Sequence, residues 1–181
     1  MLTGFINRKT VLAAAAGILI SCGSSNSHKT MEKVEIKTNQ ECMEDKTLTV
    51  KELSFNTSKP TADEIEAAFN AKNVEYNAID CANWASYNGE YQPSVRFRIG
   101  YTEEEIYIQY LVTENDIKAV YGEDAGSKPY TDSCVEFFAI PGEGGEYYNL
   151  ELNCIGKGTF AGGAQRTDRT RYGDDVLSQI R

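Results

Sequence analysis

The sequence predicts an all-β protein: an antiparallel β-sandwich of jelly-roll type with one short helix near its N-terminus. Short runs in which apolar residues alternate with polar ones recur between residues 48 and 156. The chain has 15 glycines, which supply the turns between such runs. One good helix signal interrupts them, near residue 61. Many short strands with a single early helix are typical of a sandwich.

The predicted elements follow one another closely. Thr61 can cap a helix whose third residue, Glu64, completes a capping box, and we expect this helix to end near Lys72. Two strands around the turn 102–104 should pair as an antiparallel hairpin. In chain order, the strands expected before residue 122 are 48–55, 74–80, 94–101, 105–112 and 116–121.

Residues 130–156 predict a second hairpin around which the domain is built. Counting in steps of two gives an apolar face that holds Val135, Phe137, Tyr148, Leu150, Leu152 and Cys154. The opposite face holds Tyr130, Asp132, Glu136, Asn149, Glu151 and Asn153. Two registers keep the apolar residues together. One sets Glu136 opposite Glu151, and the other sets it opposite Asn153.

Residues 157–181 predict no closing strand. The segment is Gly-rich and then charged, with a short helical turn expected over 174–180. The sandwich is therefore expected to lack its C-terminal part. We expect the three arginines of this tail to be solvated: Arg166, Arg169 and Arg171. Two arginines of the first hairpin, Arg96 and Arg98, are expected to be either solvated or paired with acidic residues.

The N-terminus predicts a lipoprotein. Residues 1–21 combine two basic residues with ten apolar ones and end before Cys22, the expected lipidation site. The apolar run is shorter than the roughly 20 residues of a membrane-spanning helix. Residues 22–46 then form a flexible tether, and 47–181 the folded domain. This places the protein in the cell envelope, at the outer membrane, with the membrane face left open.

Net charge limits the binding partners that the protein can have, and cysteine content limits its disulfides. The net charge is −9, and loss of residues 1–21 makes it more negative, so nucleic acid is excluded and membrane contact is expected through the lipid alone. An exported chain permits disulfides. Cys134 and Cys154 fall on opposite faces of the hairpin, which argues against their pairing with each other. Three full pairings of the remaining cysteines stay open: Cys42, Cys81, Cys134 and Cys154.

Several kinds of chemistry lack the residues they need. The one histidine, His28, lies in the tether, which excludes Ser-His-Asp catalysis and His-ligated zinc from the domain. The methionines also precede the domain, so haem has no axial ligand. Paired carboxylates remain possible, because a glycosidase needs two carboxyls with separated pKa values. Glu136 and Glu151 are the candidate pair for that alternative.

Three segments resemble the family 9 carbohydrate-binding modules and their lipoprotein relatives in glycan-degrading Gram-negative bacteria. They are NAIDCANW (77–84), SVRFRIGYTEEEIYIQYLV (94–112), and KPYTDSCVEFFAIP with YYNLELNCIG. The resemblance implies a jelly-roll sandwich with a sugar slot. It makes Tyr130 one wall of the slot and Glu136 its glutamate. Glu151 and Asn153 match the polar pair of the returning strand, where the family has Arg at the position of Glu151.

The resulting prediction is a lipid-anchored, non-catalytic domain that retains glycans for partner glycoside hydrolases. An aromatic ring covers the apolar face of a sugar, and carboxylates and amides bind its hydroxyls. The predicted binding residues are Tyr130, Asp132, Glu136, Glu151 and Asn153. No cofactor is required, although the resemblance implies a structural Ca²⁺ for which Glu123 and Asp124 are candidates. A glycosidase and a structural lipoprotein with an incomplete slot are the alternatives.

Overall fold

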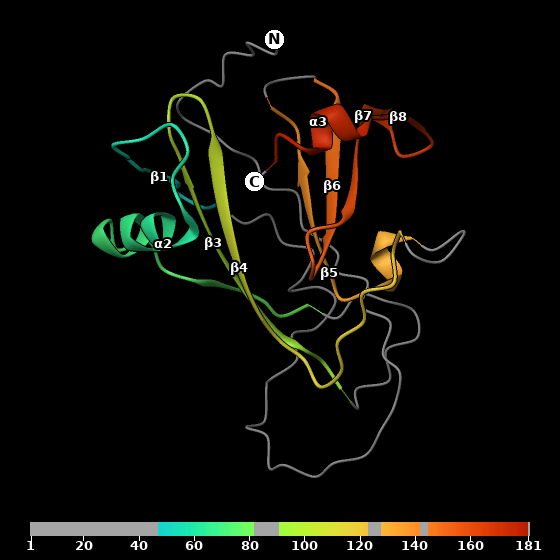
Figure 1. Cartoon of the computed structure of the whole chain (residues 1–181), viewed down its shortest axis with the longest axis horizontal. Coiled ribbons are helices and arrows are strands. Elements are labelled where there is room, and N and C mark those ends of the chain that lie inside the picture. Colours follow the sequence, from blue (N-terminus) through green and yellow to red (C-terminus); the bar gives the residue numbers. More distant parts are fainter. Residues whose placement is uncertain (1–46, 82–90, 123–127, 142–144, 181) are drawn as a thin grey trace. The chain divides into compact units, whose positions relative to one another are not determined.

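The computed structural model describes residues 47–81, 91–122, 128–141 and 145–180. These residues form two compact units: residues 48–80 with 91–114, and a second unit that contains 115–180. Each unit is built on a four-stranded sheet, and helices are few and short (Figure 1). The predicted all-β class is therefore confirmed, with two sheets rich in antiparallel pairing. The predicted signal peptide, lipidation site Cys22 and tether lie outside the described residues.

Strand β3 (Ser94–Tyr101) is the centre of the first unit. It pairs antiparallel with β4 (Ile106–Thr113) along its whole length, which confirms the predicted hairpin. It also pairs antiparallel with β2 (Asn77–Ile79) and parallel with β1 (Lys51–Glu52). The strands predicted over 48–55 and 74–80 thus shorten to these paired cores.

Helix α2 (Ala62–Ala71) begins and ends as its sequence predicts. Thr61 accepts from the Glu64 N–H, Glu64 accepts from the Thr61 N–H, and Lys72 is the C-cap. Phe69, fully buried, packs against Gly100 of β3. A Cβ at Gly100 would lie 2.7 Å from Leu53, so the glycine is what allows this close packing.

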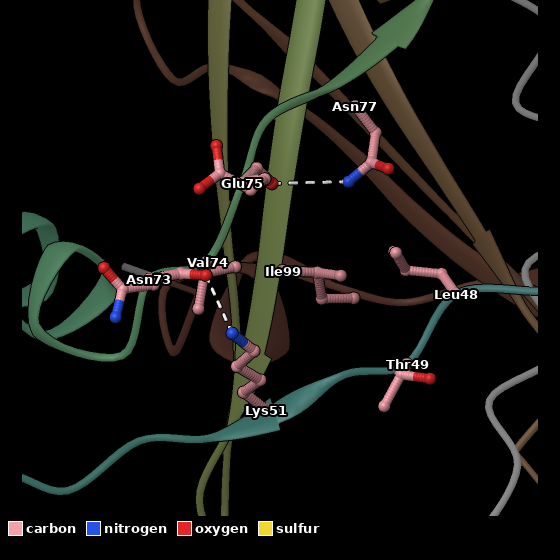
Figure 2. A pocket seen from close by; sticks show the side chains of 8 residues that line it. All are labelled: Leu48, Thr49, Lys51, Asn73, Val74, Glu75, Asn77 and Ile99. Atoms are coloured by element: carbon pink, nitrogen blue, oxygen red, sulfur yellow. Dashed lines mark hydrogen bonds between the residues drawn. The ribbon is translucent and has the colours of Figure 1, made fainter.

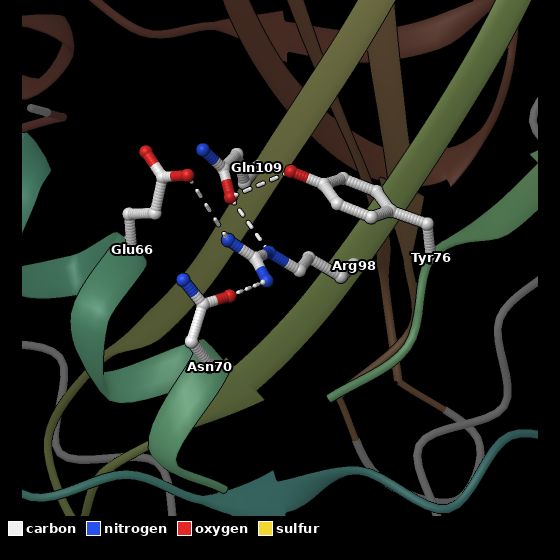
Figure 3. A network of polar contacts seen from close by, with 5 residues as sticks. All are labelled: Glu66, Asn70, Tyr76, Arg98 and Gln109. Atoms are coloured by element: carbon white, nitrogen blue, oxygen red, sulfur yellow. Dashed lines mark hydrogen bonds and ion pairs between the residues drawn. The ribbon is translucent and has the colours of Figure 1, made fainter. Parts of the chain in front are cut away.

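Arg98 corrects the expectation that this strand's arginines are solvated or held by surface acids (Figure 3). It is 3% exposed because helix α2 covers its face of β3. Its Nη1 donates to Asn70 Oδ1 at 2.7 Å and its Nε to Gln109 Oε1 at 2.7 Å. The guanidinium also stacks on two rings, with centroid distances of 4.7 Å to Phe69 and 4.6 Å to Tyr76. Glu66 is a distant ion partner at 4.0 Å.

The second unit contains the predicted 130–156 hairpin. Its strands are β5 (Cys134–Ala139) and β6 (Tyr147–Asn153), preceded by the 3₁₀ turn η1 (Pro129–Thr131). They pair antiparallel with Glu136 opposite Glu151, which settles the choice between the two registers. The segment 116–121, predicted as a strand, belongs to neither sheet.

The charged tail forms two further strands that sequence patterning missed. Strands β7 (Gly158–Gln165) and β8 (Asp168–Arg171) complete the order β5-β6-β7-β8, and α3 (Asp174–Leu177) follows as the expected helical turn. The alternation of apolar and polar residues did not predict β7 and β8, because these segments are rich in glycine and charged residues, which are uncommon in strands. In this sheet Gly158 is required: a Cβ there would lie 1.7 Å from the Glu151 carbonyl oxygen.

Gly158→Ala is expected to lower the free energy of unfolding by about 2–3 kcal/mol, because β7 must move away from β6. Denaturant unfolding followed by circular dichroism measures this loss. Gly145→Ala is the matched control, since its Cβ would meet the nearest atom, Pro141 O, at an ordinary 3.5 Å. Equal stability of the two variants would contradict the close approach of β6 and β7.

Candidate functional site

The polar face of the β5–β8 sheet gathers the chemistry-bearing side chains of the second unit. We call it the carboxylate face and define it by the strand register. Neighbouring Cα partners point to the same side of a sheet, so each strand contributes alternate residues. These are Cys134, Glu136, Phe138, Tyr147, Asn149, Glu151, Asn153, Thr159, Ala161, Gly163, Arg169 and Arg171.

Glu136 and Glu151 are the central pair of this face. They lie directly opposite each other on β5 and β6, and Glu136 is only 6% exposed. Burial, followed by the negative charge of Glu151, raises the pKa of Glu136 to about 7, against the opposing charges of Arg166 and Arg169. Burial also raises the pKa of Glu151, while Arg169 and Arg171 oppose this rise. At neutral pH the pair therefore holds a proton part of the time, and can donate as well as accept hydrogen bonds.

Arg169 corrects the expectation that the arginines of the tail are all solvated, and the charges of all three act on the carboxyl pair. Arg169 is half-buried and donates from Nη1 to Asn149 Oδ1 at 2.9 Å. Its guanidinium lies 5.6 Å from the centroid of the Tyr147 ring. It reaches these groups from β8 across β7, where its register partner is Gly163. Arg166 and Arg171 are exposed, as expected.

Asp132 and Asn153 form a separate, buried cluster at the start of β5. Asp132 Oδ2 accepts from Asn153 Nδ2 at 2.9 Å and from the Tyr121 N–H at 2.8 Å. Asn153 Oδ1 accepts from the N–H groups of Ile155 and Lys157. Burial raises the pKa of Asp132, but the hydrogen bonds from Asn153 and the backbone outweigh it and the net pKa is lowered. Asp132 and Asn153 therefore hold neighbouring backbone groups in place, and their contacts with a sugar remain a prediction.

Tyr130 lies apart from the carboxylate pair, on η1. Its ring is half-buried, and Lys128 Nζ lies 5.7 Å from the ring centroid. The turn containing Tyr130 packs against β5 and β6, and Asp132, the residue that ends it, accepts a hydrogen bond from Asn153. Its role as an aromatic wall stays a prediction.

An aromatic pair on the carboxylate face was not among the predicted site residues. Phe138 and Tyr147 lie on neighbouring strands with ring centroids 6.2 Å apart and an interplanar angle of 17°. They stand beside Asn149, the register partner of Phe138. Their parity was a usable signal, because each falls an even number of residues from Glu136 or Glu151. These half-buried rings supply an aromatic surface next to the carboxylates.

A pocket in the first unit is a weaker candidate (Figure 2). It has a volume of about 170 Å³, below the usual range for ligand sites. Lys51, its one cation, already donates to the carbonyl oxygens of Lys72 and Asn73 at 2.9 and 2.8 Å. The other lining residues are Leu48, Thr49, Val74, Glu75, Asn77 and Ile99.

The described part of the chain offers few side chains for metal binding or for thiol chemistry. No group of three or more metal-ligating side chains occurs there, and Glu123 and Asp124 lie outside it. Cys81 is disulfide-bonded, whereas Cys134 and Cys154 are free thiols. They are not bonded to each other, as their opposite faces predicted, but the full pairings of the four cysteines that the sequence left open are wrong. Burial, then the charges of Glu136 and Glu151, raises the pKa of Cys134 to about 12, so this thiol stays protonated. None of the described helices has the length and apolar character to span a membrane.

The polar face combines carboxylates, an amide, arginines and aromatic rings, which are the chemical groups that bind the hydroxyls and the C–H faces of sugars. The family comparison identifies the group: the model of carbohydrate-binding family 9 matches residues 63–181, and the chain belongs to that family. The crystal structure of a candidate carbohydrate-binding protein from Bacteroides uniformis is similar, at 33% identity and a TM-score of 0.62. The match covers 72% of this chain and 58% of that one. No curated protein matches the sequence.

Proposed function

We propose that this chain is a lipid-anchored, non-catalytic carbohydrate-binding domain that retains glycans at the cell envelope for partner glycoside hydrolases. The observation that carries the proposal is the carboxylate face of a family 9 domain: the Glu136–Glu151 pair beside the Phe138–Tyr147 rings. The rings cover the C–H face of a sugar. The carboxyls bind its hydroxyls, and the partly protonated pair serves both donor and acceptor needs of a hydroxyl.

Calorimetric titration of the folded protein with a panel of mono- and oligosaccharides tests the binding. We expect Glu151→Ala to weaken binding about tenfold or more, because it removes the half-exposed acceptor of the pair. Glu52→Ala, an exposed change on β1 of the other unit, is the control and should bind like the parent. Absence of heat with every sugar, from protein with a native circular dichroism spectrum, would exclude the proposal.

A glycosidase is the alternative that the carboxyl pair favours. Glu136, with its pKa raised to about 7, has the property of a general acid, and Glu151 lies opposite it. Chromogenic glycosides assayed with the parent and with Glu136→Gln distinguish the two functions. Sugar binding without turnover supports the non-catalytic function, whereas turnover that is lost in Glu136→Gln supports the enzyme.

Lipid anchoring rests on the sequence before residue 47. The full-length protein is expected to partition into the detergent phase when expressed in a Gram-negative host, and Cys22→Ala to remain in the aqueous phase. Protease treatment of intact cells then reports which membrane face carries the domain. Aqueous partitioning of the parent protein would rule out the anchor.

A further inference from the structure

The β7–β8 hairpin places positive charge beside the two carboxyls of the carboxylate face. The chain carries a net charge of −9, yet the β7–β8 hairpin brings three arginines to act on the two carboxyls of this face: Arg166, Arg169 and Arg171. Burial keeps Glu136 partly protonated at neutral pH, so it does not fully cancel an arginine. Three arginines therefore act beside two carboxyls here, on a protein whose net charge is negative.

The three arginines differ in how far the protein already uses them. Arg169 is committed, since it donates to Asn149 and to the Arg166 carbonyl oxygen and lies over Tyr147. Arg171 is exposed, and Tyr121 Oη is the one hydrogen-bond partner of its guanidinium within the described ranges. That bond orients the Arg171 side chain and leaves most of its donors for a ligand.

A second donor on the face, the Asn149 side-chain amide, has no acceptor in hydrogen-bond geometry among the residues that the structure describes. Asn149 is 1% exposed, and its amide lowers the pKa of Glu136. Even so, Asn149 Nδ2 is outside hydrogen-bond geometry with every acceptor of the described chain. Its Oδ1 is held by Arg169, so the orientation of the amide is fixed. A buried donor without a partner is costly, and an oxygen-rich ligand beside Arg169 would relieve that cost.

Resting on the proposed sugar binding, we infer that the ligand of this face is an acidic glycan whose carboxylate is bound by Arg171. Guanidinium groups bind planar carboxylates with two parallel hydrogen bonds, which a neutral hydroxyl cannot form. The Phe138–Tyr147 rings and the Glu136–Glu151 pair then take the apolar face and the hydroxyls of the same sugar unit. Arg171 is in this sense the residue that selects for charge.

Titration with an oligogalacturonide and with the same oligosaccharide after carboxyl reduction tests the inference. At low ionic strength we expect the acidic form to bind about tenfold more tightly or better, with the advantage shrinking in high salt. Arg171→Gln should remove this preference, so that the variant binds the acidic and the reduced forms with equal affinity. Arg96→Gln, which changes an exposed arginine of the other sheet, should keep the preference. A sulfated galactan, which carries sulfate groups but no carboxylate, is the third probe.

The outcomes separate this inference from the proposed function. Equal or tighter binding of the reduced oligosaccharide overturns the inference while leaving sugar binding intact. A preference that persists in Arg171→Gln overturns the assignment of Arg171. Binding of the sulfated galactan in place of the uronate overturns the carboxylate as the recognised group. No binding to any probe or neutral sugar overturns the proposed function itself.

Discussion

Glu136→Gln is expected to flatten the pH dependence of stability of this protein between about pH 4.5 and pH 7. The folded state raises the pKa of Glu136 from 4.5 to about 7, mainly through burial. A raised pKa means that the folded protein holds a proton that the unfolded chain releases. This contribution is complete below the unfolded pKa and is lost as the pH rises through about 7. Its size is on the order of 3 kcal/mol.

Denaturant midpoints measured from pH 4 to pH 8 check this prediction. Above pH 7, Glu136→Gln should be more stable than the parent, because a neutral amide replaces a buried charge. A residual slope of the same sign is expected from Glu151, whose pKa is also raised. Glu52→Gln, at an exposed position, should keep the parent slope. If Glu136→Gln keeps the parent slope as well, the prediction that burial of Glu136 causes this pH dependence is wrong.

Arg98→Met is expected to lower the free energy of unfolding by about 3–5 kcal/mol, the range for removing one member of a buried charged network. The change takes away the donors bonded to Asn70 Oδ1 and Gln109 Oε1, both at 2.7 Å. Gln109 keeps the hydroxyl of Tyr76 as a donor at 3.0 Å, whereas Asn70 loses its partner inside the structure. The stacking on the Phe69 and Tyr76 rings is lost as well. Thermal and denaturant unfolding both report the loss.

Arg96→Met provides the matched control for this effect. Arg96 lies two residues earlier on the same face of β3, and its guanidinium also lies over Tyr76, with a centroid distance of 5.5 Å. It is exposed, so its loss should cost less than about 1 kcal/mol. A similar loss from both variants would show that charge on this strand matters and the Arg98 hydrogen bonds do not.

The sequence was sufficient wherever a local pattern decides the structure. The capping box of α2, the β3–β4 hairpin and the two faces of the β5–β6 hairpin follow from side chains within a few residues of one another. Strand alternation has a period of two whatever the strand pairs with, so the grouping of Glu136 with Glu151 was accessible from sequence alone. The resemblance to family 9 could also be recognised from the sequence, because it lies mainly in the β3–β4 and β5–β6 hairpins, where local patterns are clear.

Tertiary structure decided what depends on pairing between distant segments. Gly158 and Gly163 permit the close approach of β7 to its neighbouring strands. Composition alone does not show this, because a glycine-rich segment predicts a loop. Arg98 is buried because a helix about 30 residues earlier in the chain covers its face. Arg169 reaches Asn149 across a whole strand, at a sequence separation of 20. The sequence by itself determined which face carries the carboxylates. Only the fold decided which arginines face them, because cross-strand neighbours are chosen by register and not by spacing along the chain.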